Sequence, residues 1–245
     1  MIRFLRSAPL LDEACSYAFP SVEAASPEGI VCAGGNLSPG LLLSAYRQGI
    51  FPWYGEGEPI LWWSPDPRFV ILPETLHVPA SSARLLKRRE FTLSLDRDFG
   101  GVISACARAN RPGQDGTWIL PDMIAAYKRL HELGYAHSVE VWREGELAGG
   151  LYGMSLGGAF FGESMFSVSS GASRVGFLNL AAMLFRQGFS LIDSQVRTDY
   201  VAGMGGVDLP RKIYLDHLAV ALGQPDRRGS WRILFPSFPA PEPNS

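Results

Sequence analysis

The sequence contains few cysteines, and they form no recognisable pattern. Cys15, Cys32 and Cys106 are odd in number and far apart, and no CxxC pair occurs in the 245 residues. This spacing excludes the disulfide framework of small secreted domains, and it also excludes a zinc ribbon. We therefore expect a reduced protein of the cytoplasm.

The sequence also lacks an excess of charge and a long apolar run. The formal net charge is -2, so contact with a nucleic acid requires a local basic patch. No stretch approaches the roughly 18 apolar residues of a membrane helix. Asp12 and Glu13 interrupt the apolar N-terminal segment, which makes it a poor signal peptide. With 47% hydrophobic residues, we expect a soluble chain of one large domain or two smaller ones, with no membrane contact.

Several catalytic and cofactor motifs are absent from the sequence. It has no GxSxG elbow, no Walker A loop and no GxGxxG fingerprint. His131-Glu132 begins like a zinc-binding motif, but the next histidine, His137, lies beyond Gly134 and cannot share its helix face. We also find no clear R/QxxGxG/A loop of the kind that acetyltransferases use for coenzyme A. The sequence predicts neither a metal nor a cofactor.

The composition changes near residue 67. Before that point the chain is rich in Pro, Gly and Trp, and it predicts one helix, with Ser38 as N-cap and Pro39 as its first residue. The next segment, FPWYGEGEPILWWSPDPR, holds four prolines and two glycines, which exclude a long regular element. We predict a small N-terminal α/β domain over residues 1–67 and a larger domain over residues 68–245, with a proline-rich tail from about residue 234.

The larger domain has the pattern of an α+β fold. Strand patterns in HSVEVWR, LAGGLYGMSL and AFFGESMF are separated by glycine-containing turns and predict an antiparallel meander. An amphipathic helix, ASRVGFLNLAAMLFRQ, and a further strand, FSLIDSQV, follow. This order predicts a mixed sheet of the kind found in the acetyltransferase superfamily, although architecture alone does not fix function.

A series of motifs occurs in a fixed order between about residues 28 and 220. They are GGNLSPGLLLSAYRQGIFPWY, PILWWSPDPR, GTWI, AYKRLHELGYAHSVEVW, GGLYG, FFGESMFS and LIDSQV. In this order they strongly resemble the bacterial leucyl/phenylalanyl-tRNA–protein transferase family. The resemblance implies an N-terminal domain packed on an acetyltransferase-like (GNAT-like) domain. It also implies two substrates: an aminoacyl-tRNA carrying Leu, Phe or, less well, Met, and a protein with an N-terminal Arg or Lys, which is then degraded through the N-degron pathway.

Two candidate catalytic residues lie on the strand LIDSQV. The implied reaction is aminolysis of an activated ester, which requires a neutral amine held against a carbonyl carbon. Asp193 and Gln195 alternate with their neighbours, so we expect them on one strand face, with Ile192 on the other. The resemblance assigns both residues to activating or positioning the acceptor amine. The alternative for Asp193 is a structural carboxylate at a strand end.

Glu163 is the third candidate catalytic residue. It lies in the apolar strand FFGESMFS, where a buried carboxylate requires a partner. We expect it to recognise an ammonium group, and the resemblance to the family's GES motif favours a role at the aminoacyl site. The alternative is a buried ion pair with an arginine such as Arg174.

The donor side chain requires an apolar pocket, for which the resemblance supplies the lining residues. They are Leu151, Phe160, Met165, Phe177, Leu180 and Ile192. Such a pocket rejects β-branched side chains by shape and polar ones by desolvation. An adaptable methionine suits both Leu and Phe. The alternative for each residue is ordinary core packing.

Aromatic and basic side chains provide candidates for RNA contacts. Trp53 and Trp118 match family tryptophans that contact the terminal adenosine or the aminoacyl end, in line with the stacking of RNA ends on aromatic rings. A basic run on one predicted short helix supplies candidates for phosphate contacts. Its members are Arg84, Lys87, Arg88 and Arg89. The alternative for this run is a solvated charged face.

Two positions depart from the family pattern. Tyr200 stands where family members usually carry a His, and Ser194 stands where a Cys is common. The first departure puts a role for an imidazole in proton transfer in doubt. Two other classes stay open, an N-acyltransferase that uses acyl-CoA and an adaptor that binds protein N-termini without modifying them. Nothing in the sequence requires more than a monomer.

Overall fold

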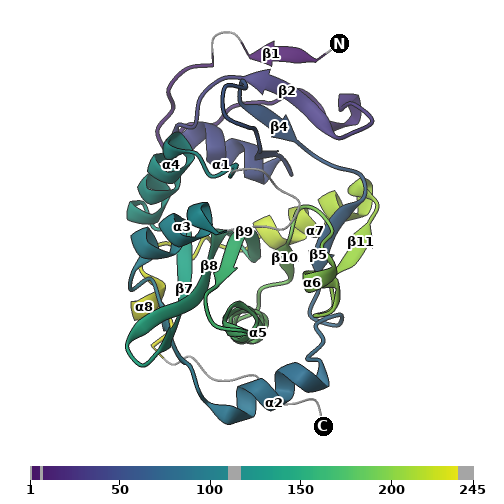
Figure 1. Cartoon of the computed structure of the whole chain (residues 1–245). Helices are drawn as coiled ribbons and strands as arrows, with labels where there is room; N and C mark the ends of the chain where they lie inside the picture. The colour runs from purple at the N-terminus through teal and green to yellow at the C-terminus, as the bar shows by residue number, and fades with distance from the viewer. Residues whose placement is uncertain (1, 6–7, 110–116, 237–245) are drawn as a thin grey trace.

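The chain folds around two β-sheets (Figure 1). The computed structural model describes residues 2–5, 8–109 and 117–236. The smaller sheet has the order β1 (Arg3–Leu5), β2 (Ile30–Gly34), β4 (Leu61–Trp63) and β3 (Phe51–Pro52). A 3-10 helix (Val22–Ala24) lies between β1 and β2 in the chain, and the sheet packs on α1 (Pro39–Arg47). All four strands are formed by residues before 64.

Helix α1 begins at Pro39, as predicted, and is followed by Gly49 with a φ of +73°. Ser38 occupies the N-cap position, but its hydroxyl does not bind the helix. It accepts a hydrogen bond from the backbone N–H of Leu11 at 3.0 Å instead. The N-terminal segment is therefore held to the start of α1.

The larger sheet has seven strands in the order β11, β5, β10, β9, β8, β7 and β6. Their bounds are Val207–Leu209, Arg68–Ile71, Leu191–Asp193, Ala159–Ser167, Glu146–Leu156, Ala136–Arg143 and Thr92–Leu95. The β10–β9 pair is parallel and the other pairs are antiparallel. The predicted meander and the mixed sheet of an α+β fold are confirmed.

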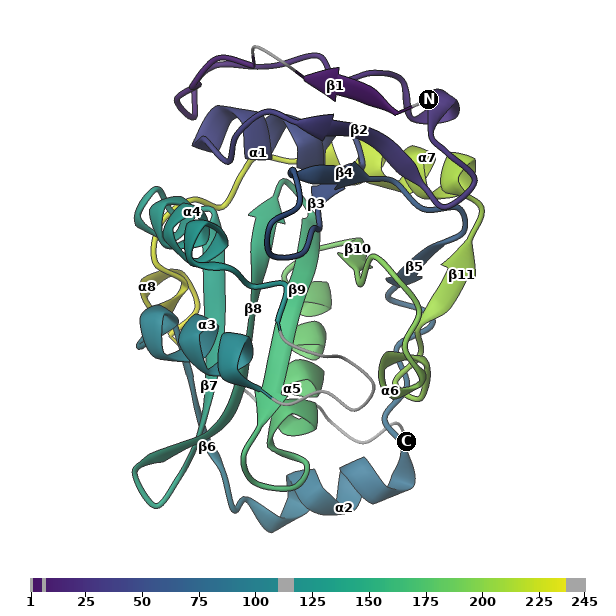
Figure 2. The same cartoon turned by 45° about the horizontal axis from the view of Figure 1, so that its top comes forward.

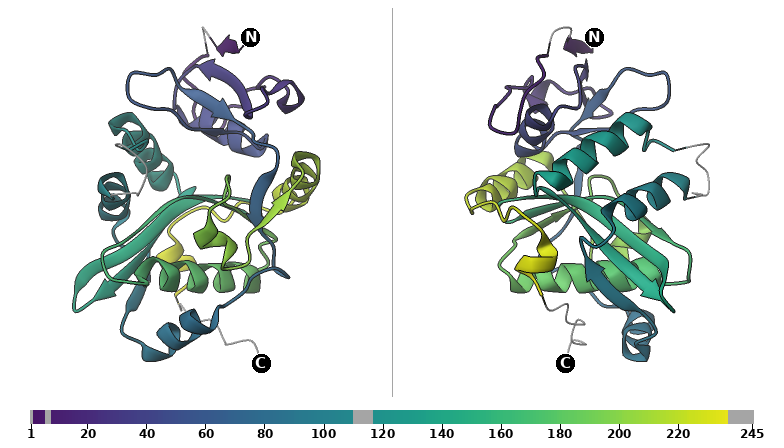
Figure 3. Two further views of the ribbon diagram at one scale, coloured as in Figure 1. Left: turned by 45° about the vertical axis from the view of Figure 1, so that its right-hand side comes forward. Right: turned by 90° about the vertical axis from the view of Figure 1, so that its left-hand side faces the viewer.

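Helices cover both faces of the large sheet. Helices α3 (Phe99–Arg108) and α4 (Pro121–Glu132) lie on one face, and α5 (Ala172–Arg186) crosses the other (Figures 2 and 3). The remaining helices are α2 (Ala80–Arg88), α6 (Asp199–Ala202), α7 (Arg211–Leu222) and α8 (Trp231–Leu234). Because the central strands are covered on both sides, β7 and β8 are buried along most of their length.

One predicted boundary differs from the structure. The strand expected through residue 196 ends at Asp193, because Gln195 adopts a φ of +63°, outside the β region. The tail expected from about residue 234 would follow α8, which ends at Leu234 and whose Trp231 is fully buried. Residues 237–245 of that predicted tail lie outside the described residues.

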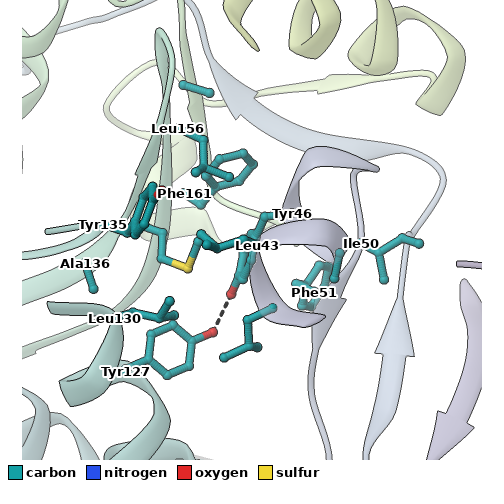
Figure 4. Close-up of a cluster of buried hydrophobic side chains, with 14 of the residues drawn as sticks. Leu43, Tyr46, Ile50, Phe51, Tyr127, Leu130, Tyr135, Ala136, Leu156 and Phe161 are labelled. Carbon is teal, nitrogen blue, oxygen red and sulfur yellow. Dashed lines mark hydrogen bonds between the residues drawn. The ribbon is translucent and has the colours of Figure 1, made fainter. Parts of the chain in front are cut away.

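One buried apolar cluster joins the two sheets. Leu43 and Tyr46 from α1 meet Tyr127 and Leu130 from α4, with Phe161 of β9 beside them (Figure 4). The rings of Tyr46 and Phe161 lie 5.1 Å apart, edge to face. A second cluster packs α5 against the other face of the sheet. The smaller sheet is therefore attached through shared core side chains.

None of the helices in the described part of the chain is long and apolar enough to cross a membrane.

Candidate active site

A cavity of about 800 Å³ lies between the β3 region, the meander and the start of α5. Its wall includes aromatic residues before β4 and in the segment before α4, side chains of β8 and β9, and the residues that follow β10. The lining residues are Phe51, Pro52, Trp53, Trp118, Leu151, Tyr152, Phe160, Gly162, Glu163, Ser164, Met165, Phe166, Ser167, Ser173, Phe177, Ser194, Gln195, Val196, Thr198, Tyr200 and Val201. Most of the lining side chains are apolar, and Glu163 and Gln195 are among those that supply polar groups.

Four of the six predicted pocket residues line this cavity. Leu151 comes from β8, Phe160 and Met165 from β9, and Phe177 from α5. Leu180 and Ile192 are not among the lining residues, and their assignment stays a prediction. They are 1% and 0% exposed and belong to the same core cluster as Phe160 and Phe177.

Glu163 lies in β9 and is 9% exposed. Its Oε1 accepts hydrogen bonds from the hydroxyl of Tyr46 at 2.6 Å and from Nε2 of Gln195 at 3.0 Å. Its Oε2 accepts one from the hydroxyl of Tyr127 at 3.0 Å. The two tyrosine hydroxyls are also hydrogen-bonded to each other. These three side chains are the hydrogen-bond partners of Glu163, so the alternative of an ion pair with Arg174 is not observed.

The surroundings of Glu163 favour its neutral form. Burial raises the pKa of its carboxyl to about 7, and the nearby charge of Asp193 acts in the same direction. The hydrogen bonds from Tyr46, Tyr127 and Gln195 oppose this rise in part. Burial also raises the pKa of both tyrosine hydroxyls well above the ordinary value. The group is therefore poised to exchange a proton near neutral pH.

Asp193 has a different environment. It is 0% exposed and does not belong to the cavity wall. Arg68 of β5, also 0% exposed, donates from Nε to Oδ1 at 2.8 Å and from Nη2 to Oδ2 at 2.7 Å. The hydroxyl of Tyr214 donates to Oδ2 at 2.8 Å. The prediction that Asp193 and Gln195 present their side chains together on one strand face is therefore wrong.

Gln195 connects the two carboxylates. Its backbone N–H donates to Oδ1 of Asp193 at 2.9 Å, while its side-chain amide donates to Glu163. The positive φ of Gln195 turns the chain out of β10 and makes both contacts possible. Asp193 thus holds the backbone of Gln195, and Gln195 presents its side chain to the cavity.

The guanidinium of Arg68 is enclosed by aromatic rings. It lies 4.7 Å from the ring centres of both Phe51 and Tyr214, and Nη1 donates to the carbonyl of Gly49 at 3.2 Å. Burial alone would lower the pKa of this arginine, but the facing Asp193 raises it above the ordinary value. The guanidinium therefore stays charged inside the protein.

Both predicted tryptophans lie on the cavity wall. Trp53 and Trp118 are partly buried, and Trp53 packs against Trp63 with their ring centres 5.4 Å apart. The indole N–H of Trp63 donates to the carbonyl of Trp53 at 2.6 Å. This contact fixes the backbone at the point where Trp53 enters the cavity.

The predicted basic run lies outside the cavity. Its four members, Arg84, Lys87, Arg88 and Arg89, belong to α2 and its C-terminal end. Helix α2 packs against the start of α5, where Leu85 contacts Gly171. The next residues of α5 include Ser173, which belongs to the cavity wall. The basic face thus lies on an element that adjoins one side of the cavity.

Tyr200 also belongs to the wall. Its hydroxyl is hydrogen-bonded to Ser173 at 2.8 Å, and Ser173 in turn bonds Ser167 at 2.9 Å. The guanidinium of Arg174 lies 5.0 Å from the ring centre of Tyr200. The residue that departs from the family pattern therefore helps to close the cavity on the side of α5.

Sequence reasoning missed four residues of this site: Arg68, Tyr214, Tyr46 and Tyr127. A signal existed for Arg68, because a charged residue opens an otherwise apolar strand. The three tyrosines were indistinguishable from core residues on amphipathic helices. Within the described residues, no group of three His, Cys, Asp or Glu side chains is placed to hold a metal ion.

A mixed sheet with an apolar cavity beside a buried carboxylate and an amide defines an enzyme that holds an apolar group next to a polar reaction centre. The family model of the leucyl/phenylalanyl-tRNA protein transferase matches residues 70–219, and the model of that family's N-terminal domain matches residues 35–66. The chain therefore belongs to the leucyl/phenylalanyl-tRNA–protein transferase family, and the resemblance inferred from its motifs is confirmed.

Individual relatives agree with this assignment. A leucyl/phenylalanyl-tRNA–protein transferase from Anaeromyxobacter sp. (strain Fw109-5) is 55% identical over 213 residues, which cover 87% of this chain and 91% of the relative. A protein of the same name from Nitratidesulfovibrio vulgaris (strain DP4) is 51% identical over 224 residues, covering 91% and 95%. Both relatives are named as transferases.

Similar solved structures include acetyltransferases. A GCN5-related N-acetyltransferase from Kribbella flavida has a TM-score of 0.37 and 13% identity, with 70% of this chain and 61% of that chain covered. A ribosomal-protein-alanine N-acetyltransferase from Brucella melitensis biovar Abortus 2308 has a TM-score of 0.35 and 18% identity, covering 51% and 88%. At these values the likeness carries no information about activity.

Proposed function

We propose that this enzyme transfers Leu or Phe, and less well Met, from an aminoacyl-tRNA to the N-terminal Arg or Lys of a protein. The product is a new peptide bond, and the former ester oxygen stays with the terminal ribose of the tRNA. The observation that carries this proposal is that one cavity is lined both by a set of apolar side chains and by the hydrogen-bonded pair Glu163 and Gln195. An apolar donor side chain and a reacting amine can be held next to each other there.

The donor side chain packs against the apolar part of this lining. Leu151, Phe160, Met165 and Phe177 provide a wall without a charged group. A polar donor loses its hydration there without a replacement partner, and a β-branched donor meets the wall at its first side-chain carbon. The flexible thioether of Met165 accommodates donors of different shape.

The terminal adenosine of the tRNA stacks near Trp53 and Trp118. Both rings are on the cavity wall, and base stacking on an aromatic ring contributes about 1–3 kcal/mol. The cations of α2 contact phosphates further along the acceptor stem. Contacts to phosphates, which do not depend on the RNA sequence, are therefore made outside the cavity, and the aminoacyl end is recognised inside it.

The acceptor amine binds at the polar groups of the cavity. Glu163 is the one carboxylate among the lining residues that the structure describes, so it is the group available to an ammonium there. Gln195 orients the amine, and Asp193 acts on it only through the backbone of Gln195. No step requires a covalent enzyme intermediate, because the aminoacyl ester is already activated; the enzyme contributes chiefly by holding both substrates together.

Acting in the cytoplasm as a monomer, the enzyme marks acceptor proteins for N-degron degradation. Two other classes of protein remain as outcomes of its test. An acyl-CoA N-acyltransferase does not depend on tRNA, and an adaptor binds N-termini with no turnover.

The test is transfer of radiolabelled Leu or Phe from its tRNA to a model protein that begins with Arg, beside the same protein beginning with Ala. Label on the Arg protein alone, abolished when the donor is treated with RNase, supports the proposal. Binding of the Arg protein without labelling supports the adaptor, and acyl transfer from acyl-CoA with no tRNA requirement supports the other transferase.

A further inference from the structure

The two buried carboxylates on either side of Gln195 differ in how many of their oxygen lone pairs are already used. A carboxylate offers about four hydrogen-bonding positions. Asp193 fills them with Nε and Nη2 of Arg68, the hydroxyl of Tyr214 and the backbone N–H of Gln195. A proton therefore has no position on Asp193 unless one of these bonds breaks.

Glu163 has a position to spare. Among the residues that the structure describes, its Oε1 accepts from Tyr46 and Gln195, but its Oε2 accepts from Tyr127 alone. Glu163 also belongs to the cavity wall, whereas Asp193 does not. Of the two carboxylates, only Glu163 is open both to a substrate and to an added proton.

The tyrosines around Glu163 form a closed ring of hydrogen bonds. Three contacts join Tyr46 to Tyr127, Tyr46 to Glu163, and Tyr127 to Glu163. When the carboxyl is ionised, only the two hydroxyl protons are available for these three contacts, so one contact has no proton to form a hydrogen bond. When the carboxyl is protonated, three protons serve three contacts. The ring can therefore take up one added proton, while the same two hydroxyls donate to the carboxylate when it is ionised.

We propose that Glu163, rather than Asp193, accepts the proton that the acceptor α-amine loses before attack, with Tyr46 and Tyr127 sharing that proton within the ring. This inference rests on the proposed function. Glu163 takes one proton from the ammonium form of the amine. The neutral nitrogen then forms the C–N bond, the bond between the carbonyl carbon and the ribose oxygen breaks, and the proton shed by that nitrogen goes to the ribose oxygen. Glu163 returns its own proton to solvent.

The charged and titratable groups near Glu163 agree with this role. Tyr46 faces it from α1 and Tyr127 from α4, while the ion pair of Asp193 and Arg68 lies behind it at β10 and β5. Burial raises the pKa of Glu163 to about 7, which matches a base that works near neutral pH. Asp193 is held by two hydrogen bonds from Arg68.

The test is the pH profile of kcat/KM for transfer from Leu-tRNA to a peptide beginning with Arg. This profile reports the pKa values of the free enzyme and of the free substrate. Titration of the free acceptor amine changes the rate over one pH range of this profile, and no substitution in the enzyme can move that range. Titration of the enzyme changes the rate over a second range, here called the enzyme limb. The enzyme limb is expected near pH 7 in the unsubstituted protein.

Two substitutions distinguish a proton acceptor from a structural group. Tyr127→Phe removes a donor that stabilises the ionised carboxyl, so the enzyme limb moves to higher pH while the rate at alkaline pH is retained. Glu163→Gln abolishes the enzyme limb and lowers the plateau by roughly 10²- to 10⁴-fold, the usual contribution of general base catalysis. Tyr54→Phe is the matched control, because Tyr54 bonds Asp122 outside the cavity wall and its substitution leaves the limb in place.

An unchanged pH profile in Glu163→Gln overturns the inference, and so does an equal loss of rate at every pH in Tyr127→Phe. The absence of transfer by the unsubstituted enzyme contradicts the proposed function instead, so the two failures are distinguishable. Circular dichroism of each variant across the pH range separates an altered profile from unfolding.

Discussion

Arg68 and Asp193 form an ion pair in which both side chains are fully buried. Removing one partner of a buried pair leaves the other uncompensated, which typically destabilises a protein by about 3–5 kcal/mol. Asp193→Asn keeps the size of the side chain and leaves the guanidinium of Arg68 without its counterion. We therefore expect a loss of stability of that order, measured as the free energy of unfolding in urea.

Tyr214→Phe is the comparison for this variant. It removes one hydrogen bond to Asp193 and leaves the ion pair intact, so a loss of about 1 kcal/mol is expected. Equal stability of the two variants would mean that the pair is not fully desolvated in solution.

Glu163 makes the stability of the fold depend on pH in the opposite direction to a salt-bridged carboxylate. Its pKa is raised from 4.5 to about 7 in the folded protein. Between these values the unfolded chain has released the proton and the folded chain retains it, so stability falls as pH rises. The stabilising contribution is complete below about pH 4.5 and is lost as pH passes through about 7, a change of roughly 3 kcal/mol.

Glu163→Gln cannot titrate and supplies the reference for this prediction. Relative to it, the unsubstituted protein is expected to lose stability between about pH 5 and pH 8. Urea unfolding of both proteins across that range provides the measurement. Parallel curves would show that the carboxyl is ionised throughout, contrary to the expectation.

At this scale the sequence was sufficient to single out Asp193, Gln195 and Glu163, but not their relation. The strand period placed Asp193 and Gln195 on one face, whereas a positive φ at Gln195 breaks that period. Such a conformation is uncommon for residues other than glycine and leaves no local signal. The partner of Asp193 lies 125 residues away along the chain, so the ion pair could not be read from local sequence either.

Among the elements, the meander β7–β8–β9 was the most predictable because its signals are local. Alternating side chains define each strand, and Gly145 and Gly157 occupy the turns with positive φ. The glycines within β8 and β9 have a different role, which depends on neighbouring side chains. Gly153 faces the backbone of Phe161 and the ring of Phe160, while Gly162 faces the cavity.

These two glycines form a matched pair for testing the cavity. A methyl group at Gly153 would meet the carbonyl oxygen of Phe161 at 2.2 Å, whereas one at Gly162 meets only the carbonyl oxygen of Asp193, at 3.7 Å. We expect Gly153→Ala to destabilise the protein by about 1–3 kcal/mol through overpacking. Gly162→Ala is expected to keep the midpoint of thermal unfolding and to raise the KM for Phe-tRNA more than for Leu-tRNA. An unchanged KM for both donors would place the donor side chain elsewhere.

Helix α2 permits a prediction about RNA binding. Replacing its basic run, Arg84, Lys87, Arg88 and Arg89, with alanine is expected to weaken tRNA binding without changing donor selectivity. The slope of log K against log salt should become shallower by about one for each phosphate that the variant no longer neutralises. Binding measured at several salt concentrations tests this. Arg186→Ala and Lys212→Ala, cations on α5 and α7 outside the cavity wall, serve as controls and should leave the slope unchanged.

On the scale of the whole molecule, the change in composition near residue 67 coincides with the passage from the smaller sheet to the larger one. The sequence could not indicate how closely the two parts are joined. That connection consists of buried contacts such as Tyr46 with Phe161 and Tyr46 with Glu163, between residues more than 100 positions apart. Contacts of this kind have no local signature.

Because one apolar cluster includes side chains of both sheets, we expect the chain to unfold in a single cooperative transition. Differential scanning calorimetry should give one peak, with equal calorimetric and van't Hoff enthalpies. Two resolved peaks would show that the parts are stable independently and that the shared cluster contributes little.

The buried tyrosines also give the enzyme an optical property. Burial raises the pKa of Tyr46, Tyr54, Tyr127 and Tyr214 above the ordinary value. At a pH near the ordinary pKa of tyrosine, these four of the eight tyrosines therefore remain neutral phenols and lack the longer-wavelength absorbance of tyrosinate. Tyr46, Tyr127 and Tyr214 belong to the same hydrogen-bonded centre as Glu163 and Asp193. The appearance of their tyrosinate absorbance thus marks the moment at which water reaches the centre of the site.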